Sequence, residues 1–319
     1  MSKIATAINL LKHNRGEFLA FILMHLNFLF SDKLYLSLLF RFKMGYWIDW
    51  KNPKTFSEKL QWLKLYDRKP EYTTMVDKYG VKEYVAKIIG EEYIIPTLGV
   101  WDRPEDIDWD SLPQKFVLKT THGGGGSGVF ICKDKTTFNK TEAIEKLNKS
   151  LSNCIYQTFR EWPYKNVDKK IIAEILLEDS ITIKKNTDLP DYKFYCFNGK
   201  PVYCQVIRDR RSKETIDFYD MEWNHKPFVG LNPVVNNGLN PVANNGLNPV
   251  AKPTSLCKML DVCSKLSIGI PFSRIDFYVI DDKIYFGEIT FYPASGLGIF
   301  TPIEWNEKLG SMIKLPFEN

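Results

Sequence analysis

Four consecutive glycines, Gly123–Gly126, stand between two apolar runs that are typical of β-strands. The run before them, Phe116–Leu118, is followed by Lys119, and the run after them contains "VFICKD". Adjacent glycines lose much conformational entropy on ordering, so a tight turn alone would hardly require four of them. We therefore predict a glycine-rich hairpin lid whose backbone N–H groups fold over phosphates, because no side chain blocks their approach. The alternative is a flexible surface hairpin without a ligand.

Gly123, Gly125 and Gly128 also satisfy the spacing G-x-G-x-x-G, which is a weak signal by itself. A dinucleotide-binding fingerprint requires a helix directly after the glycines, and a strand-like run follows here instead. A Walker A loop would end in Gly-Lys-Ser or Gly-Lys-Thr, which this loop lacks. A protein kinase carries its lysine after the glycine loop, whereas Lys119 comes before it. The loop therefore matches none of these three classes.

A second hairpin is predicted near the C-terminus by the segment "RIDFYVIDDKIYFGEIT". We expect a three-residue turn at Asp281–Lys283, which puts Asp276 directly opposite Glu288, with Cβ atoms roughly 5 Å apart. Arg274 and Thr290 form another pair on the same face of the sheet. The other face is the core face, and its residues are Ile275, Phe277, Val279, Tyr285 and Ile289. A two-residue turn would shift the register by one residue and separate the acidic pair.

Two opposed carboxylates repel each other unless a cation lies between them. Because oxygen-only ligation suits Mg²⁺, Asp276 and Glu288 are candidate magnesium ligands. The alternative is an exposed strand face on which Arg274 bridges both acids. A lid that grips phosphates and a hairpin that holds Mg²⁺ together indicate a nucleoside triphosphate site between them.

The composition is that of a globular chain, since 44% of the 319 residues are apolar and 25% are charged. A chain of this length buries a large core and divides into two or three subdomains. The net charge of +5 is compatible with anionic ligands or an anionic membrane face and is too small to indicate nucleic acid. The six cysteines form no CxxC pair and no cluster with histidine at zinc spacing, which favours reduced thiols in a cytosolic protein.

The segment Phe18–Phe30 is the most apolar part of the chain. Its 13 residues are too few to span a bilayer as a helix, and no small-residue cleavage site follows that would mark a signal peptide. The next segment, "SDKLYLSLLFRFK", places Leu34, Leu38 and Leu39 on one helical face. We favour two core helices of an N-terminal region, and the alternative is a helix that lies on the cytoplasmic membrane surface.

Capping residues and hydrophobic periodicity predict further elements. Thr55 and Glu58 form a capping box for one helix, and "VKEYVAKIIG" predicts another that Gly90 ends. The sequences "TEAIEKLNKSLSN" and "SLCKMLDVCSKL" predict two more helices, and "KIIAEILLED" predicts a buried strand. The Asn198-Gly199 step marks the turn of a hairpin. Three near-identical octads between residues 230 and 253 predict a surface loop without chemistry of its own.

Together these segments resemble the ATP-grasp superfamily. The most similar group is the TupA-like one, which is named for teichuronopeptide biosynthesis and whose members sit in polysaccharide-biosynthesis gene sets. The resemblance covers roughly residues 52–305, and its signals are "NPKTFSEKLQWLKLYD", "DKYGVKEYV", "FVLKTTHGGGGSGV", "DYKFYCFNGK" and "RIDFYVIDDKIYFGEITFYPASGL". It implies an α+β protein with the ATP-grasp fold, which holds a nucleotide between two α+β subdomains preceded by an N-terminal helical region.

The implied organisation has four parts. They are an apolar helical region over 1–50, an α-rich subdomain over 51–113, a glycine-lid subdomain over 114–170 and a C-terminal subdomain over 171–319. The last part carries the magnesium-binding hairpin and the inserted octad loop over 230–253. The nucleotide is expected between the last two parts.

The resemblance also implies how the chain holds ATP. Lys119 contacts the α- and β-phosphates, the glycine lid closes over the β- and γ-phosphates, and Lys193 lies near the phosphates. The main chain of a hinge pairs with the adenine edge, and Glu178 accepts the ribose hydroxyls. The lid residues are Gly123, Gly124, Gly125, Gly126, Ser127 and Gly128, and the hinge residues are Glu174, Ile175, Leu176 and Leu177.

For the reacting groups, the resemblance implies that Asp276 and Glu288 bind Mg²⁺. Arg274 is expected to steady an acyl-phosphate and a tetrahedral intermediate. Either Arg208 or Arg210 is expected near the acceptor carboxylate.

One position departs from the family pattern. Thr290 stands where many members carry Asn, two residues after the glutamate ligand. A hydroxyl can still bind Mg²⁺ or hold a water, although a second metal would then be bound more weakly. We expect His122, beside the lid, to be a loop residue without a catalytic role.

The resemblance implies an ATP- and Mg²⁺-dependent ligase in which ATP phosphorylates a carboxylate, an amine attacks the acyl-phosphate, and ADP and phosphate are released. The family context implies that an amino acid or amine is joined to a glycan or sugar carboxylate, such as a uronic acid, in the synthesis of a capsule or other surface polysaccharide. We expect a cytoplasmic protein, with peripheral contact to the inner membrane face as an option. The alternatives are a glycosyltransferase of the same pathway and a non-catalytic nucleotide-binding scaffold.

Overall fold

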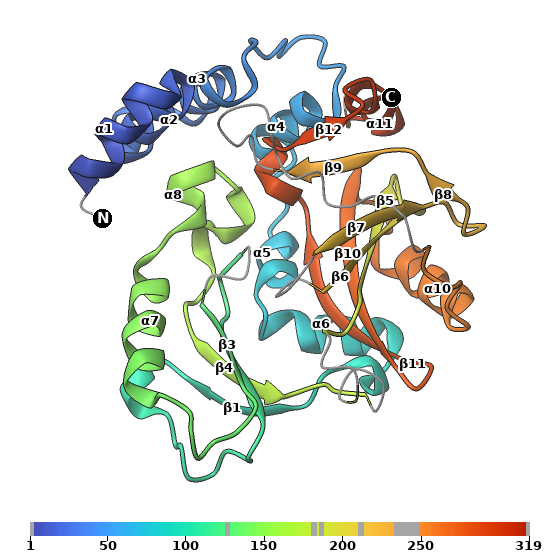
Figure 1. Cartoon of the computed structure of the whole chain (residues 1–319). Helices are drawn as coiled ribbons and strands as arrows, with labels where there is room; N and C mark the ends of the chain where they lie inside the picture. Colours follow the sequence, from blue (N-terminus) through green and yellow to red (C-terminus); the bar gives the residue numbers. More distant parts are fainter. Residues whose placement is uncertain are drawn as a thin grey trace.

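The structure of the chain, a computed structural model, describes residues 3–124, 128–179, 184, 188–209, 214–232 and 249–316. In this part of the chain the strands pair into two main antiparallel sheets, with helices between and around them (Figure 1). The smaller sheet has the strand order β1-β4-β2-β3, and the larger has the order β11-β10-β5-β6-β7-β8. The architecture is therefore α+β, as predicted.

The smaller sheet contains β1 (Thr97–Trp101), β2 (Phe116–Thr120), β3 (Val129–Cys132) and β4 (Ile171–Ile175). The larger sheet contains β5 (Asp191–Phe197), β6 (Lys200–Arg208), β7 (Thr215–Tyr219), β8 (His225–Lys226), β10 (Phe272–Ile280) and β11 (Lys283–Thr290). A separate pair joins β9 (Val229–Asn232) to β12 (Ile299–Thr301). The predicted domain boundary at residue 170 falls directly before β4, so the smaller sheet takes strands from three of the four predicted parts.

The helices include α1 (Lys3–His13), α2 (Arg15–His25), α3 (Asp32–Met44), α4 (Phe56–Tyr66), α5 (Glu71–Val76), α6 (Gly80–Ile89), α7 (Lys140–Ser152), α8 (Ile155–Phe159), α10 (Leu256–Leu266) and α11 (Trp305–Met312). Short 3₁₀ helices are η1 (Asn27–Leu29), η2 (Glu91–Tyr93), η3 (Pro104–Asp106), η4 (Trp162–Asn166) and η5 (Pro293–Gly296). Helices α5 and α6 lie between the two sheets, and α5 contacts β11 (Figure 1). The predicted helices and the buried strand β4 are thus confirmed.

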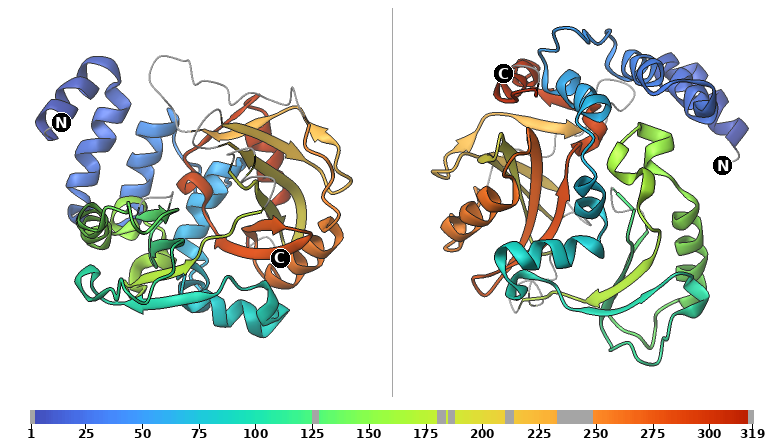
Figure 2. Two further views of the ribbon diagram at one scale, coloured as in Figure 1. Left: turned by 60° about the horizontal axis from the view of Figure 1, so that its bottom comes forward. Right: turned by 180° about the vertical axis from the view of Figure 1, so that it is seen from behind.

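The N-terminal helices α1, α2 and α3 lie side by side in a layer at the edge of the molecule (Figure 2). Their small core contains Ala20, Leu23, Tyr35, Leu39 and Phe40. The predicted apolar face of α3 is partly wrong, because Leu34 is half exposed while Tyr35 and Leu36 are buried. Tyr35 turns inward and its hydroxyl donates to the carbonyl oxygen of Thr158 at 2.7 Å. Within the described residues, none of the helices has both the length and the apolar character needed to cross a membrane.

Helix α4 is buried over most of its length, although its sequence contains many polar residues. The predicted capping box is present, since the Glu58 N–H donates to Thr55 Oγ1 at 3.2 Å and the Thr55 N–H donates to Glu58 Oε2 at 3.0 Å. Buried polar side chains of α4 bind the C-terminal part of the chain. These bonds include Ser57 Oγ to Asn306 Oδ1 (3.2 Å), Lys59 Nζ to the Ile313 carbonyl oxygen (2.7 Å) and Gln61 Nε2 to the Ser295 carbonyl oxygen (2.9 Å).

The hairpin β5–β6 turns at Asn198 and Gly199, as predicted. Their φ angles of 49° and 81° are both left-handed, which is the conformation that a two-residue type I′ turn requires. The Asn198 side chain also donates to the carbonyl oxygen of Met312 at 2.7 Å, so the turn is tied to the end of α11.

The turn of the hairpin β10–β11 is shorter than predicted. Asp281 and Asp282 alone form it, with φ angles of 48° and 63°, and Ile280 pairs with Lys283. Asp tolerates the left-handed conformation, so two residues suffice to close the hairpin. The predicted core face is accordingly wrong near the turn, where Tyr285 is only partly buried and the buried residues are Ile284 and Phe286.

The octad segment begins inside a strand. Gly230–Asn232 belong to β9, which pairs with β12, so the first repeat does not start as a loop. Residues 233–248, which hold most of the three repeats, lie outside the described residues. After this segment, Val250 is held in place because its N–H donates a hydrogen bond to the Tyr219 hydroxyl oxygen at 2.8 Å.

Candidate nucleotide and metal site

A β-bulge in β11 produces the acidic pair that the sequence predicts. The register of β10 and β11 shifts by one residue at Gly287, so that Asp276 lies opposite Glu288. Without this extra residue the short turn would place Glu288 opposite Ile275, on the buried face. A Cβ atom at Gly287 would lie 3.1 Å from the Asp276 carbonyl oxygen, which favours glycine at the bulge. The predicted pairing is therefore confirmed, although the predicted turn is wrong.

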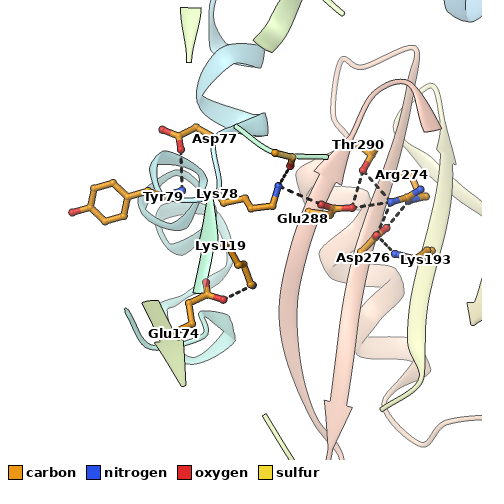
Figure 3. Close-up of polar contacts among 11 residues, drawn as sticks. Asp77, Lys78, Tyr79, Lys119, Glu174, Lys193, Arg274, Asp276, Glu288 and Thr290 are labelled. Atoms are coloured by element: carbon orange, nitrogen blue, oxygen red, sulfur yellow. Dashed lines mark hydrogen bonds and ion pairs between the residues drawn. The ribbon is translucent and has the colours of Figure 1, made fainter. Parts of the chain in front are cut away.

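Arg274 lies on the same face and bridges the two acids (Figure 3). Its Nε and Nη2 donate to the two carboxylate oxygens of Asp276, both at 2.8 Å. Its Nη2 also donates to Glu288 Oε1 at 2.9 Å and to Thr290 Oγ1 at 3.1 Å. Lys193, from β5, donates to Asp276 Oδ2. The bridge is the one expected of the alternative interpretation, but the face is only partly exposed: Asp276 is 4% accessible, whereas the Glu288 side chain is 38% accessible.

The surrounding cations keep Glu288 ionised. Burial by itself raises the pKa of this carboxyl, but Lys78, Arg274 and Lys193 outweigh burial and lower the pKa to about 2. Burial lowers the pKa of the Arg274 guanidinium, but the charges of Asp276 and Glu288 outweigh burial and raise it. A carboxylate that is ionised at every physiological pH is available to a metal cation.

Lys78 is a site residue that the sequence argument missed. It lies between α5 and α6, and its Nζ donates to the carbonyl oxygen of Gly123 in the lid and stands 3.9 Å from Glu288 Oε2 (Figure 3). Its own N–H donates to the Thr121 carbonyl oxygen at 3.0 Å. The neighbouring Asp77 accepts from the Tyr79 N–H at 3.0 Å, which fixes the start of α6. The sequence feature that could have indicated Lys78 is the Asp77-Lys78 step, which directly precedes a predicted helix inside the segment "DKYGVKEYV".

Lys119 faces a buried acid on the floor of the smaller sheet. Its Nζ donates to Glu174 Oε2, and Lys82 from α6 lies 2.6 Å from Glu174 Oε1. Burial raises the pKa of Glu174, but Lys119 and Lys82 outweigh burial and lower it overall. These residues and Lys78 line a pocket between α6, the sheet strands β2 and β4, and Gly287 of β11. Lys82 and Glu174 thus add to the charged groups of the site.

The glycine lid joins β2 and β3, in which Lys119 pairs with Val129. Gly128 closes the loop with a φ of 79°, and its carbonyl oxygen accepts from the Thr120 N–H at 3.2 Å. A Cβ atom there would come within 2.3 Å of Ser150 Oγ, so this position requires glycine. Of the other lid residues, the structure describes Gly123 and Gly124, while Gly125, Gly126 and Ser127 lie outside the described residues.

The predicted hinge begins at the end of β4 and continues beyond it. Glu174 lies inside the strand, and its main chain pairs with Thr97 on one side and Val117 on the other, so only its side chain is directed to the site. Residue 175 ends the strand, and the segment 176–179 has no regular structure. Hinge residues Ile175, Leu176 and Leu177 remain predicted adenine contacts. Glu178 pairs with Lys115 at 2.7 Å, and its contact with ribose also remains a prediction.

The structure does not bring Arg208 to the acidic pair. Lys193 pairs with Gln205 across β5 and β6, and side chains alternate along a strand, so Arg208 points to the opposite face of the sheet from Lys193. There it donates to Asp217 Oδ2 at 3.1 Å. Arg208 therefore lies on the other face of the sheet from the acidic pair, and the contact of Arg208 or Arg210 with the acceptor carboxylate stays a prediction. Arg210, the other candidate, lies outside the described residues.

His122, which directly precedes the lid in the chain, is buried. Its Nε2 lies 3.2 Å from the carbonyl oxygen of Ser150, and its Nδ1 has no hydrogen-bond partner within the described part of the chain. Burial lowers the pKa of His122, and Lys169 and Lys78 lower it further. A buried imidazole whose pKa is lowered in this way remains neutral at pH 7.

We expect His122 to make the protein less stable in acid. The unfolded chain takes up a proton near pH 6.5, whereas the folded chain takes it up only at a lower pH. The free energy of unfolding therefore falls as the pH drops from 6.5 through the folded-state pKa. Urea unfolding at pH 7 and pH 5 should show a smaller loss for His122→Asn than for the unsubstituted protein. His13→Asn, at an exposed histidine, is the control, and an unchanged loss in His122→Asn would contradict the assignment.

The donor set at β10–β11 suits Mg²⁺, which prefers oxygen ligands in an octahedral arrangement. Asp276 and Glu288 offer carboxylates, and Thr290 offers a hydroxyl within 3.4 Å of Glu288 Oε1. Among the residues that the structure describes, no group of three or more His, Cys, Asp or Glu side chains could hold a metal ion. Asp276, Glu288 and Thr290 would supply only part of the ligand shell of a magnesium ion, and phosphate oxygens and waters would complete it.

A sequence model of the family described as TupA-like ATPgrasp matches residues 58–314. The chain therefore belongs to the TupA-like ATP-grasp family, and its α+β architecture is the ATP-grasp fold. The predicted family and fold class are both confirmed. No curated protein matches the chain.

Several solved structures of ligases are similar to this chain at low identity. D-alanine–D-alanine ligase from Helicobacter pylori is 15% identical, with a TM-score of 0.41 over 81% of this chain and 69% of that one. The Bacillus anthracis enzyme complexed with ATP is 14% identical, with a TM-score of 0.37 over 76% and 68%. The ATP-grasp ligase PsnB, complexed with minimal precursor, Mg and ADP, is 12% identical, with a TM-score of 0.36 over 74% and 57%.

Proposed function

We propose that this protein is an ATP-dependent carboxylate–amine ligase that forms an amide through an acyl-phosphate and releases ADP and phosphate. The observation that carries the proposal is the position of Lys78. One ammonium group binds Gly123 of the lid and faces Glu288 of the acidic pair, so the lid and the hairpin belong to a single site (Figure 3). Family membership supports the same class of reaction.

The charge of the site supports a magnesium-bound triphosphate as the ligand. Five cationic and three anionic side chains meet here, which leaves a formal surplus of two positive charges. The Mg²⁺ complex of ATP carries about two negative charges, because the ion neutralises part of the phosphate charge. The cations are Lys78, Lys82, Lys119, Lys193 and Arg274, and the anions are Glu174, Asp276 and Glu288.

The pairing of Lys119 suggests how the nucleotide is accommodated. ATP would lie with its adenine against the hinge that follows β4 and its phosphates toward the lid. Lys119 then exchanges Glu174 for a phosphate oxygen. Lys82 remains within 2.6 Å of Glu174, so the buried carboxylate keeps a cationic partner when Lys119 leaves.

The residues of β10–β11 serve the reacting groups. Asp276, Glu288 and Thr290 would hold Mg²⁺, which supplies charge neutralisation at the β- and γ-phosphates. An acceptor carboxylate oxygen attacks the γ-phosphorus, and the bond to the bridging oxygen breaks, which gives ADP and an acyl-phosphate. Lys193 and Arg274 orient the acyl-phosphate and stabilise negative charge, which is the main form of catalysis available without a side-chain nucleophile.

The second half of the reaction forms the amide. The amine nitrogen attacks the carbonyl carbon of the acyl-phosphate, and the carbonyl oxygen becomes negatively charged in the tetrahedral intermediate. Arg274, whose guanidinium is charged at every relevant pH, is the donor proposed to stabilise this oxyanion. The carbon–oxygen bond to phosphate then breaks, phosphate leaves, and the amine loses a proton to solvent.

We further propose that the carboxylate belongs to a sugar, such as a uronic acid of a surface glycan or its precursor, and that the amine is an amino acid. The resemblance to a group named for teichuronopeptide biosynthesis motivates this choice. The work would take place in the cytoplasm, where ATP is supplied. If the protein were a glycosyltransferase, the glycine lid and Lys119 would have no function, and no observation in the site favours that alternative.

The test follows the oxygen atoms. With Mg²⁺, ATP, amino acids and uronic acids labelled with ¹⁸O in the carboxylate, we expect ADP formation that requires both acceptors and transfer of one labelled oxygen to phosphate. Lys119→Ala should raise the KM for ATP about tenfold or more, because it removes a charge-assisted contact with a phosphate. Lys133→Ala, at an exposed lysine after β3, is the matched control. Formation of AMP, or phosphate without the label, would overturn the acyl-phosphate mechanism.

A further inference from the structure

The N-terminal helical layer carries an unusual share of the exposed apolar surface. Sixteen large apolar residues are exposed in the part of the chain that the structure describes, and nine of them precede residue 48. Phe28 and Leu29 are the most exposed of these nine, at 76% and 63%. Single exposed apolar residues are ordinary, but a group on one structural layer indicates an interaction surface.

Helix α2 has two apolar sides with different surroundings. Ala20 and Leu23 face the core of the layer and are buried. Leu19, Ile22 and Leu26 are spaced by three and four residues, so they form one stripe along the helix, and all three are exposed. Phe28 and Leu29 of η1 follow this stripe in the chain and are also exposed. The layer of α1, α2 and α3 lies at the edge of the molecule (Figure 2).

Basic residues accompany the apolar stripe. Arg15 stands one helical turn before Leu19 on the same side of α2, and Lys12 and Lys33 are also exposed. The first 50 residues contain six lysines and arginines against three aspartates and glutamates. Two of these acids are held by basic partners, because Glu17 pairs with Lys43 at 2.5 Å and Asp32 with Arg68 at 2.7 Å. The exposed charge of the layer is therefore positive.

We propose that this face, formed by the exposed side of α2 with η1 and the neighbouring basic residues, docks on the surface of an anionic lipid bilayer. Apolar side chains enter the boundary between headgroups and acyl chains, while arginine and lysine remain at the phosphates. The charge favours this occupant over a second copy of the chain, because two such faces would bring like charges together. The proposal goes beyond the ligase chemistry and does not depend on it.

The test uses the full chain and vesicles of phosphatidylcholine with or without phosphatidylglycerol. We expect sedimentation with the anionic vesicles, weaker binding to the neutral ones, and release as salt rises. Phe28→Asp combined with Leu29→Asp should weaken vesicle binding about tenfold or more, because it removes two inserted apolar groups. Ile268→Asp combined with Ile303→Asp is the matched control, since these residues are 75% and 63% exposed elsewhere on the molecule.

Thermal unfolding and ATP binding should be unchanged in both double variants, because all four side chains are exposed. The proposal is overturned if the unsubstituted chain does not bind anionic vesicles at low salt, or if both double variants lose binding equally. It is also overturned if the chain is a dimer without lipid and Phe28→Asp with Leu29→Asp dissociates it. That last result would identify the face as a contact between copies.

Discussion

Glu288→Gln is expected to lower the rate of Mg²⁺-dependent ADP formation by about 100-fold or more. The substitution keeps the shape of the side chain but removes a charge that faces Lys78 and Arg274 and would bind the metal. The apparent affinity for Mg²⁺ should fall with it. Calorimetry of ATP binding at several Mg²⁺ concentrations measures this second effect without any acceptor, so it does not require the substrates to be known.

The matched control is Asp281→Asn in the turn of the same hairpin. Asp281 is exposed and has a φ of 48°, a conformation that Asn also adopts, so both the rate and the Mg²⁺ dependence should remain unchanged. Thermal unfolding of both variants shows whether the hairpin is intact. If Glu288→Gln bound Mg²⁺ and ATP like the unsubstituted protein, Glu288 would have no part in the metal site.

Lys64→Met is expected to lower the free energy of unfolding by about 3–5 kcal/mol. Lys64 is fully buried in α4, and its Nζ donates to Gln61 Oε1 at 3.0 Å and to the carbonyl oxygens of Phe159 at 3.0 Å and Ser295 at 2.8 Å. Burial lowers the pKa of Lys64 to about 8, and the charge of Glu161 opposes that shift. Met fills the same space, but it leaves Glu161 buried without its cation.

Urea unfolding of Lys64→Met, Glu161→Gln and the double variant measures the coupling between the two groups. We expect the double variant to be clearly more stable than the sum of the single effects, because neither charge is then left alone. Lys87→Met, at an exposed lysine of α6 that pairs with Glu83, should leave the free energy of unfolding nearly unchanged, because exposed ion pairs contribute little. Additive effects would show that Lys64 and Glu161 act independently.

The sequence was sufficient for features that depend on local chemistry. The capping box of Thr55 and Glu58, the turn at Asn198-Gly199 and the strands on either side of the glycines all follow from residue types and their spacing. The acidic pair shows the limit of this approach. The sequence predicted that Asp276 lies opposite Glu288 because of a three-residue turn. In the structure, a two-residue turn and a bulge at Gly287 produce the same pairing. The prediction placed the extra residue in the turn, whereas the structure has it in the bulge, and either position brings Asp276 opposite Glu288.

Residues that come together from distant segments could not be predicted in this way. Lys78 reaches the lid and the hairpin only because α5 and α6 pack between the two sheets. Lys82 and Glu174 meet because β4 returns to pair with β1 and β2, across a predicted domain boundary. Arg208 was assigned to the site by resemblance, but the register of β5 and β6 sends it to the other face. The spacing of residues along the chain does not reveal contacts between segments that are distant in the sequence.

The burial of α4 has a consequence for the order in which the chain can fold during synthesis. Lys64 binds Ser295 and Lys59 binds Ile313, which lie 231 and 254 positions later in the chain. A ribosome adds roughly 5–20 residues per second, so these side chains wait on the order of ten seconds or more for their partners. Until these partners are synthesised, the ammonium groups of Lys59 and Lys64 are expected to be hydrated. The 3₁₀ helix η5 (Pro293–Gly296), which follows Thr290 closely and accepts hydrogen bonds from Gln61, can pack on α4 only after the β10–β11 hairpin has been synthesised.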